Sequence, residues 1–284
     1  MNFKYVDNAR RGFSGSKVTI DTIGEKVEKT DSSKSGILEY QFRALKYFSS
    51  TLKGKIRVPK VINFSNTDGY EVLILELISG PTLHHIFQTG DLFRASLITN
   101  SLWFEWTEFL SSHSLINFNC GLGDIQNYKN KLQLIEISAN RYGLKNHKVF
   151  QECFQSVVDI KASATGVCHG DFTIDNIIIA NNYFYLIDFI PSPFPSIEQD
   201  LSKLIQDGIT GWAMRYVTNN SFNFELFIVV DKLVKDALNK DLVDYDSLKK
   251  LSFLSFLRIV PYIKNESEAV VWLQCLIRLR AYFL

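Results

Sequence analysis

The spacing of apolar and polar residues predicts strands at the start of the chain and helices over most of the remainder. Residues 18–23 and 26–30 alternate between the two types on either side of a Gly-Glu turn, and residues 70–78 form a nearly continuous apolar run. Alternation is typical of half-buried strands, and a short apolar run is typical of a central strand. One helical pattern lies between them, through Leu38, Phe42, Leu45 and Leu52. The first part of the chain therefore predicts a small antiparallel sheet with one helix.

Helical spacing dominates after residue 80. Residues 93–115 repeat apolar side chains at helical intervals, residues 116–166 favour two further helices, and residues 222–284 favour three. The exception is a pair of short apolar runs within residues 167–189, which favours a hairpin. The three prolines in residues 190–196 exclude a regular helix there. Together these patterns predict an α+β chain whose second part is mostly helical.

Composition excludes several classes of protein. The chain has 284 residues and a net charge of +1, so there is no bulk electrostatic reason to expect a nucleic-acid partner. It contains no run of about eighteen apolar residues, so no membrane span is expected. Its polar, charged start is unlike a secretory signal. The four cysteines lie far apart without a Cys-x-x-Cys pair, so we expect reduced thiols and a cytoplasmic location.

Polar residues concentrate around the predicted hairpin. Asp171 and Asn176 are five positions apart in a loop before the first strand, and Asn181-Asn182 forms a turn before the second. The second strand ends at Asp188, so the hairpin returns this acid to the side of Asn176. Carboxylate and amide oxygens of this kind suit Mg²⁺, which keeps several waters and bridges substrate phosphates. An acid-ended hairpin is also compatible with a solvated turn that has no such role.

The order of these residues indicates phosphoryl transfer. That reaction needs a carboxylate that orients and deprotonates the attacking hydroxyl, and Asp171 is the candidate. Asn176 and Asp188 are then the metal ligands. A base, an asparagine five residues later and an aspartate about a dozen residues further on are the arrangement of kinase catalytic and metal-binding loops.

A family resemblance rests on the same residues. His169-Gly170-Asp171, with Asn176 five residues after the acid, and Ile187-Asp188-Phe189 resemble the motifs of the aminoglycoside phosphotransferase and choline kinase group. The resemblance implies a bilobal protein kinase-like fold with ATP and Mg²⁺ as cofactors. It implies an N-terminal nucleotide-binding lobe at residues 1–79 and a catalytic, acceptor-binding lobe at residues 80–284.

The resemblance also assigns roles in the first lobe. A loop over the nucleotide phosphates corresponds to Ser14, Gly15 and Ser16. The lysine that holds the α and β phosphates corresponds to Lys29, although Lys26 on the same strand also qualifies. Glu39, in the first turns of the following helix, would pair with Lys29, or would merely be an acid favoured near a helix N-terminus.

Three further residues take roles by resemblance. The backbone that contacts the adenine falls near residues 76–79, which places Glu76 and Ile78 in the nucleotide site. Asp200 resembles an acid that braces the catalytic loop from behind, and is otherwise a helix-start acid. His169 resembles a scaffold for that loop, because a lone histidine is usually a packed, hydrogen-bonded residue.

The acceptor is expected to be a small molecule with a hydroxyl group. Aminoglycosides are polycations that need several carboxylates, whereas the C-terminal segment here is apolar and basic. Choline needs an aromatic cage, for which Trp212, Tyr216, Tyr262 and Trp272 are candidates, although aromatic residues at helical spacing are more often core. A sugar, polyol or surface-polysaccharide precursor is therefore favoured. A choline, ethanolamine or aminoglycoside kinase, a protein kinase and a non-catalytic kinase-like binding protein stay open, as does the oligomeric state.

Overall fold

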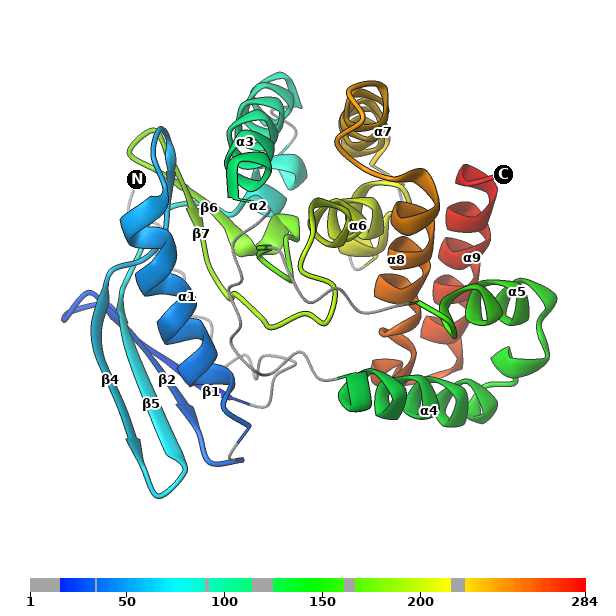
Figure 1. Cartoon of the computed structure of the whole chain (residues 1–284), viewed down its shortest axis with the longest axis horizontal. Helices are drawn as coiled ribbons and strands as arrows, with labels where there is room; N and C mark the ends of the chain where they lie inside the picture. Colours follow the sequence, from blue (N-terminus) through cyan, green and yellow to red (C-terminus); the bar gives the residue numbers. More distant parts are fainter. Residues whose placement is uncertain (1–15, 34, 90–91, 114–124, 161–166, 216–222) are drawn as a thin grey trace.

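The structure is a computed structural model, and it describes residues 16–33, 35–89, 92–113, 125–160, 167–215 and 223–284. In the N-terminal part, four strands form an antiparallel sheet in the order β1-β2-β5-β4. Their bounds are Lys17–Asp21 for β1, Lys26–Asp31 for β2, Val61–Thr67 for β4 and Tyr70–Glu76 for β5. Figure 1 shows this sheet at the left, with β5 inside it as the apolar run predicted.

Helix α1 (Ile37–Thr51) packs against this sheet. Its N-cap residue is Gly36, which has a φ of 69° and no side chain to cap the helix. The buried carboxylate of Glu71, on β5, instead accepts a hydrogen bond from the Leu38 N–H at 3.1 Å. Burial raises the pKa of Glu71. The sheet therefore supplies the cap that fixes the start of α1, because the first N–H groups of a helix lack partners within it.

The C-terminal part is mostly helical, with α2 and α3 in the upper middle of Figure 1 near β6 and β7 and α4, α5, α7, α8 and α9 further to the right. The predicted helical regions are confirmed, and the short helix α2 is an addition that the sequence patterns did not predict. The bounds are Leu83–Gln88 (α2), Leu92–His113 (α3), Ile125–Arg141 (α4), Lys148–Val157 (α5), Ile197–Gly208 (α6), Phe224–Asn239 (α7), Tyr245–Leu257 (α8) and Glu266–Tyr282 (α9). None of the helices in the described ranges is both long and apolar enough to cross a membrane.

A second, three-stranded sheet joins the two parts. Strands β6 (Ile177–Ala180) and β7 (Tyr183–Leu186) form the predicted hairpin. Asn181 and Asn182 have φ values of 50° and 65°, as a two-residue hairpin loop of the favoured hand requires. Strand β3 (Ile56–Arg57) comes from the N-terminal part and pairs in parallel with β7. The sheet order β3-β7-β6 therefore crosses the predicted lobe boundary at residues 79–80.

The hydrophobic core is continuous across that boundary. Phe48, near the end of α1, stacks on Phe189 with ring centroids 4.6 Å apart. The same ring lies 5.7 Å from Trp106 and 5.6 Å from Phe109, both on α3. Phe48 and Trp106 are fully buried. The N-terminal helix is therefore packed directly against the residue that follows Asp188.

Candidate active site

The hairpin brings Asp188 back to Asn176, as predicted. Ile177 pairs with Leu186 at the open end of the hairpin, and the Ile187 N–H donates to the Asn176 carbonyl oxygen at 3.1 Å. Asp188 then adopts a φ of 62°, in the left-handed region that non-glycine residues seldom occupy. Backbone strain of this kind concentrates at functional sites. Register and turn together therefore place the two predicted metal ligands at one end of the hairpin.

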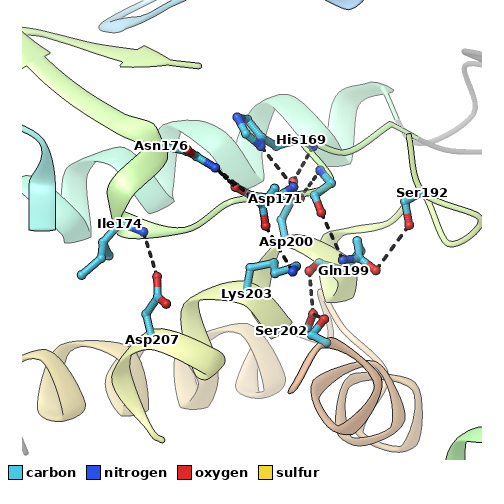
Figure 2. Close-up of polar contacts among 12 residues, drawn as sticks. His169, Asp171, Ile174, Asn176, Ser192, Gln199, Asp200, Ser202, Lys203 and Asp207 are labelled. Carbon is cyan, nitrogen blue, oxygen red and sulfur yellow. Dashed lines mark hydrogen bonds and ion pairs between the residues drawn. The ribbon is translucent and has the colours of Figure 1, made fainter. Parts of the chain in front are cut away.

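Asn176 also holds Asp171. The Asn176 side-chain amide donates to the Asp171 carbonyl oxygen at 2.9 Å and to its Oδ2 at 3.0 Å (Figure 2). The Asn176 Oδ1 atom faces away from these bonds and accepts no hydrogen bond from the described residues. The side chains of Asp171 and Asp188 are 31% and 42% exposed, so both carboxylates reach solvent. The Asn176 side chain is thus hydrogen-bonded to Asp171, and the Asn176 backbone is hydrogen-bonded to Ile187, the residue before Asp188.

Asp200 braces the loop of His169, Gly170 and Asp171 from behind, which is the contact expected from the resemblance. Its fully buried carboxylate accepts hydrogen bonds from the His169 N–H, the Gly170 N–H and the Trp106 indole, each at 2.9 Å. Burial raises the pKa of Asp200 to about 7, against the lowering effect of these three donors. Gly170 has a φ of 83°, and a Cβ there would overlap the Ile190 carbonyl oxygen. The loop therefore needs both the glycine and the acid.

His169 is a scaffold residue, as predicted. Its side chain is fully buried, and Nδ1 accepts a hydrogen bond from the Asp171 N–H at 3.2 Å. Its ring lies 4.2 Å from the Phe189 ring. Burial lowers the pKa of His169 to about 4, so the ring is neutral at physiological pH. Its contact is with the Asp171 backbone rather than with the carboxylate.

Lys203, which the sequence analysis did not single out, contacts Asp171 directly. It lies on α6, and its Nζ is 3.1 Å from Asp171 Oδ1 (Figure 2). Burial is the largest single influence on Asp171 and would raise its pKa, but the charge and hydrogen bond of Lys203, with smaller contributions from His169 and Arg258, together lower the pKa. Asp171 is therefore an ionised carboxylate at neutral pH, able to accept a hydrogen bond or a proton from a hydroxyl.

A single face of α6 supports the whole loop. Asp200, Lys203 and Asp207 follow one another at intervals of three and four residues, so they share one side of the helix. Asp207 accepts a hydrogen bond from the Ile174 N–H at 2.9 Å, and burial raises its pKa to about 7. Figure 2 shows these three side chains pointing from α6 toward the loop that holds Asp171.

The N-terminal part contributes Lys29 to the same place. Lys29 is buried, forms an ion pair with Asp188 and donates a hydrogen bond to Gln41 Oε1 at 3.1 Å. Lys26 is exposed on the same strand. The predicted Lys29–Glu39 pair is wrong: Glu39 forms an ion pair with Arg43 at the surface of α1. Residues 39 and 41 point in nearly opposite directions from a helix, and Gln41 occupies the buried side.

The other predicted nucleotide contacts are only partly within the described residues. Ser14 and Gly15 lie outside them, and Ser16 is buried just before β1. Glu76 is engaged in the sheet: its N–H donates to the Lys60 carbonyl oxygen at 3.0 Å, and its carboxylate accepts from the Lys60 N–H at 2.7 Å. Ile78 follows β5, and within the described chain no hydrogen bond uses its N–H. Of the two residues beside the predicted adenine, Ile78 retains a free backbone donor.

The donor set is compatible with a hard divalent ion. No group of three or more His, Cys, Asp or Glu side chains in the described ranges is arranged to hold a metal. The protein oxygens available as metal ligands are one carboxylate, from Asp188, and one amide oxygen, from Asn176. Mg²⁺ typically takes one or two protein oxygens and fills its octahedron with phosphate and water oxygens. The residues therefore fit a metal that arrives with a phosphate ligand.

Solved structures with a similar fold include aminoglycoside phosphotransferases. A thermostable variant of aminoglycoside phosphotransferase APH(4)-Ia, in a ternary complex with AMP-PNP and hygromycin B, aligns with a TM-score of 0.56 and 12% identity over 94% of this chain and 90% of that chain. Spectinomycin phosphotransferase APH(9)-Ia, in complex with ADP and spectinomycin, aligns with a TM-score of 0.56 and 12% identity over 95% of this chain and 90% of that chain. Aminoglycoside-3'-phosphotransferase of type VIII aligns with a TM-score of 0.52 and 15% identity over 85% of each chain. No protein-family model and no curated protein sequence matches.

At these identities the likeness concerns the fold. The chain has the bilobal, protein kinase-like α+β fold of the aminoglycoside phosphotransferases, with a small antiparallel sheet and a larger helical part. This confirms the fold class predicted from the sequence.

Proposed function

We propose that this chain, which has the fold of the aminoglycoside phosphotransferases, transfers the γ-phosphoryl group of ATP to a hydroxyl of a small molecule. The observation that carries the proposal is the joint placement of Asp171, Asn176 and Asp188, with Lys29 in contact with Asp188. The AMP-PNP and ADP held by the structural neighbours support a nucleotide in this fold. The same residues argue against a kinase-like protein that only binds its ligand, because such a protein has no use for an ionised Asp171.

Each residue has a defined part in the reaction. Asp171 accepts a hydrogen bond from the acceptor hydroxyl and takes its proton, the hydroxyl oxygen bonds to the γ-phosphorus, and the bond to the β–γ bridging oxygen breaks to release ADP. Asn176 and Asp188 would hold Mg²⁺, which neutralises phosphate charge when bound. Lys29, now paired with Asp188, would contact the α and β phosphates. Rate enhancement comes from positioning and charge neutralisation.

The favoured acceptor is a sugar or polyol, including a surface-polysaccharide precursor, in the cytoplasm. The structure weakens the choline alternative, because Trp212 and Trp272 are buried at 6% and 0% exposure and pack against Phe256. Two of the four aromatic residues considered for a cage are therefore core. Glu198, an acid in the segment after Asp188, accepts a hydrogen bond from the Asp244 N–H at 3.1 Å. An aminoglycoside acceptor would need carboxylates from elsewhere.

Replacing Asp188 with alanine tests the metal role. We expect the variant to lose Mg²⁺-dependent nucleotide affinity by at least about tenfold, since residues that merely orient metal ligands contribute that much. Titration of AMP-PNP with and without Mg²⁺, by calorimetry, measures the effect. Asp175→Ala is the matched control, because Asp175 lies in the same loop but pairs with His84 at 2.6 Å. Equal Mg²⁺ dependence in the Asp188 variant and the parent would contradict the assignment.

Replacing Gln41 tests how Lys29 is held. Gln41→Ala removes the hydrogen bond that fixes the lysine, so ATP affinity should fall by about three- to tenfold, the value of one partly buried hydrogen bond. Glu39→Ala should leave ATP affinity unchanged, because Glu39 pairs with Arg43. Parallel nucleotide titrations of the two variants compare them. A larger loss of ATP affinity in the Glu39 variant than in the Gln41 variant would contradict this and favour the predicted Lys29–Glu39 pair.

A further inference from the structure

Three basic residues come from neighbouring elements of the C-terminal part, and one of them contacts Asp171. Lys203, on α6, lies 3.1 Å from Asp171. Arg258 is the residue at which α8 ends, and α8 packs along α6. Lys131 is on α4, which packs against the short helical turn Val260–Tyr262 just after Arg258. Figure 1 shows α4 running past the lower end of α8. We call Lys131, Lys203 and Arg258 the basic cluster.

The three charges act on one another. The Arg258 charge, then burial and then the Lys203 charge together lower the pKa of Lys131 to about 8. Burial lowers the pKa of Lys203, and Arg258 adds to this effect. Arg258 also helps to lower the pKa of Asp171. Lys203 and Arg258 therefore lie within electrostatic reach of the carboxylate proposed as the base, and Lys131 lies within reach of these two cations.

Within the described part of the chain, Lys203 is the one member of the basic cluster that forms an ion pair. The carboxylates near Lys203 are Asp171 and Asp207, and both already have partners, since Asp207 accepts the Ile174 N–H. Among the described residues, Lys131 and Arg258 form no ion pair and no side-chain hydrogen bond. Like charges held together without counter-charge are unfavourable unless a ligand supplies it.

The basic cluster leads from the base to the surface. Lys203 is buried, Arg258 is half-buried and Lys131 is exposed. Its three helices all belong to the C-terminal part, whereas the lysine proposed for the nucleotide phosphates, Lys29, comes from β2. The basic cluster therefore comes from a different part of the chain than the lysine proposed for the nucleotide phosphates, and it includes a direct contact with Asp171.

We propose that the acceptor carries an anionic group, a phosphate or a carboxylate, next to the hydroxyl that receives the phosphoryl group, and that the basic cluster binds this anion. The inference rests on the proposed function and specifies its substrate class. Oxyanions accept several charge-assisted hydrogen bonds at once, which would fix the direction of the neighbouring hydroxyl toward Asp171. The same charges repel polycationic acceptors such as aminoglycosides.

Calorimetry on the full chain saturated with AMP-PNP and Mg²⁺ tests the inference with simple probes. Glycerol 3-phosphate and inorganic phosphate should bind in the millimolar range or tighter, and glycerol and choline should bind more weakly. Lys131→Gln and Arg258→Gln should each weaken glycerol 3-phosphate binding roughly tenfold, the effect of one effective charge pair, with AMP-PNP affinity unchanged. Lys129→Gln is the matched control, because Lys129 is exposed on α4 and points away from Lys131.

The outcomes separate this inference from the proposed function. If the parent fails to bind AMP-PNP with Mg²⁺, both fail. If it binds AMP-PNP but binds glycerol or choline as well as glycerol 3-phosphate, or binds no anion in the millimolar range, only the anionic acceptor is overturned. An equal loss in the Lys129 variant would also overturn it, because the effect would then follow net charge rather than the basic cluster.

Discussion

Asp171→Asn is expected to reduce phosphoryl transfer by about 10²–10⁴-fold, the usual contribution of a positioned general base. Asparagine keeps the size of the side chain but can neither take a proton nor pair with Lys203 as a carboxylate does. Nucleotide affinity should persist, since the phosphates are proposed to contact Lys29, Asn176 and Asp188 instead. ADP release in the presence of a competent acceptor measures turnover, and an AMP-PNP titration measures binding. Nearly unchanged turnover would refute the role of Asp171.

The interpretation requires that the variant is folded. Removing the carboxylate leaves the buried Lys203 without its ion-pair partner, a change that costs about 3–5 kcal/mol in buried pairs. Asp171→Glu separates the two effects, because it retains the charge near Lys203 while displacing the carboxylate by one methylene. We expect this variant to unfold like the parent and still lose most of its turnover. Asp175→Asn, in the same loop, is the control for both measurements.

Asp200→Ala is expected to lower the free energy of unfolding by about 3–6 kcal/mol, because each buried donor without a partner costs about 1–3 kcal/mol. Three donors lose their acceptor: the His169 N–H, the Gly170 N–H and the Trp106 indole. Urea unfolding followed by fluorescence measures the change. The folded fraction should also lose turnover, because the loop that carries Asp171 is no longer held.

Glu198→Ala provides the comparison for Asp200. Glu198 lies in the same first turn of α6, but its only described hydrogen bond is an exposed one to the Asp244 N–H. Its loss should cost about 1 kcal/mol or less. Similar losses in the two variants would show that Asp200 acts as a helix-start acid and not as the brace of the catalytic loop.

The catalytic hairpin could be predicted from the sequence because its determinants are local. The Asn181-Asn182 turn fixes the register of two four-residue strands, and this register alone returns Asp188 to Asn176. The α+β division followed from the change in apolar period near residue 80. In contrast, β3 has only two residues, and its partner β7 lies far away in the sequence. No local sequence pattern therefore predicts this strand or its pairing.

The partner of Lys29 was missed because Glu39 was assigned by the family resemblance, without regard to which side of the helix is buried. The buried side of α1 contains Leu38, Gln41, Leu45 and Phe48, at intervals of three and four. Gln41 lies on this stripe, and Glu39 lies off it. A polar residue on the buried face of a helix was the available signal, and it points to a partner inside the protein.

Lys203 was missed for a related reason. Asp200, Lys203 and Asp207 place three charges on one face of a helix that is buried over most of its length. Charges on the face of a helix are usually solvated, so the sequence gives no reason to separate these three from surface residues. Only the docking of α6 beneath the catalytic loop shows that this face is internal.

The attachment of α1 and β3 to the segment around Asp188 has a consequence for control. Phe48 stacks on Phe189, and β3 pairs with the strand that ends just before Asp188. An inactive form in which α1 moved away from the site would have to separate Phe48 from Phe189 and break the pairing of β3 with β7. The enzyme proposed here would therefore be permanently assembled, and its output would follow the supply of its two substrates rather than an on–off rearrangement of its helix.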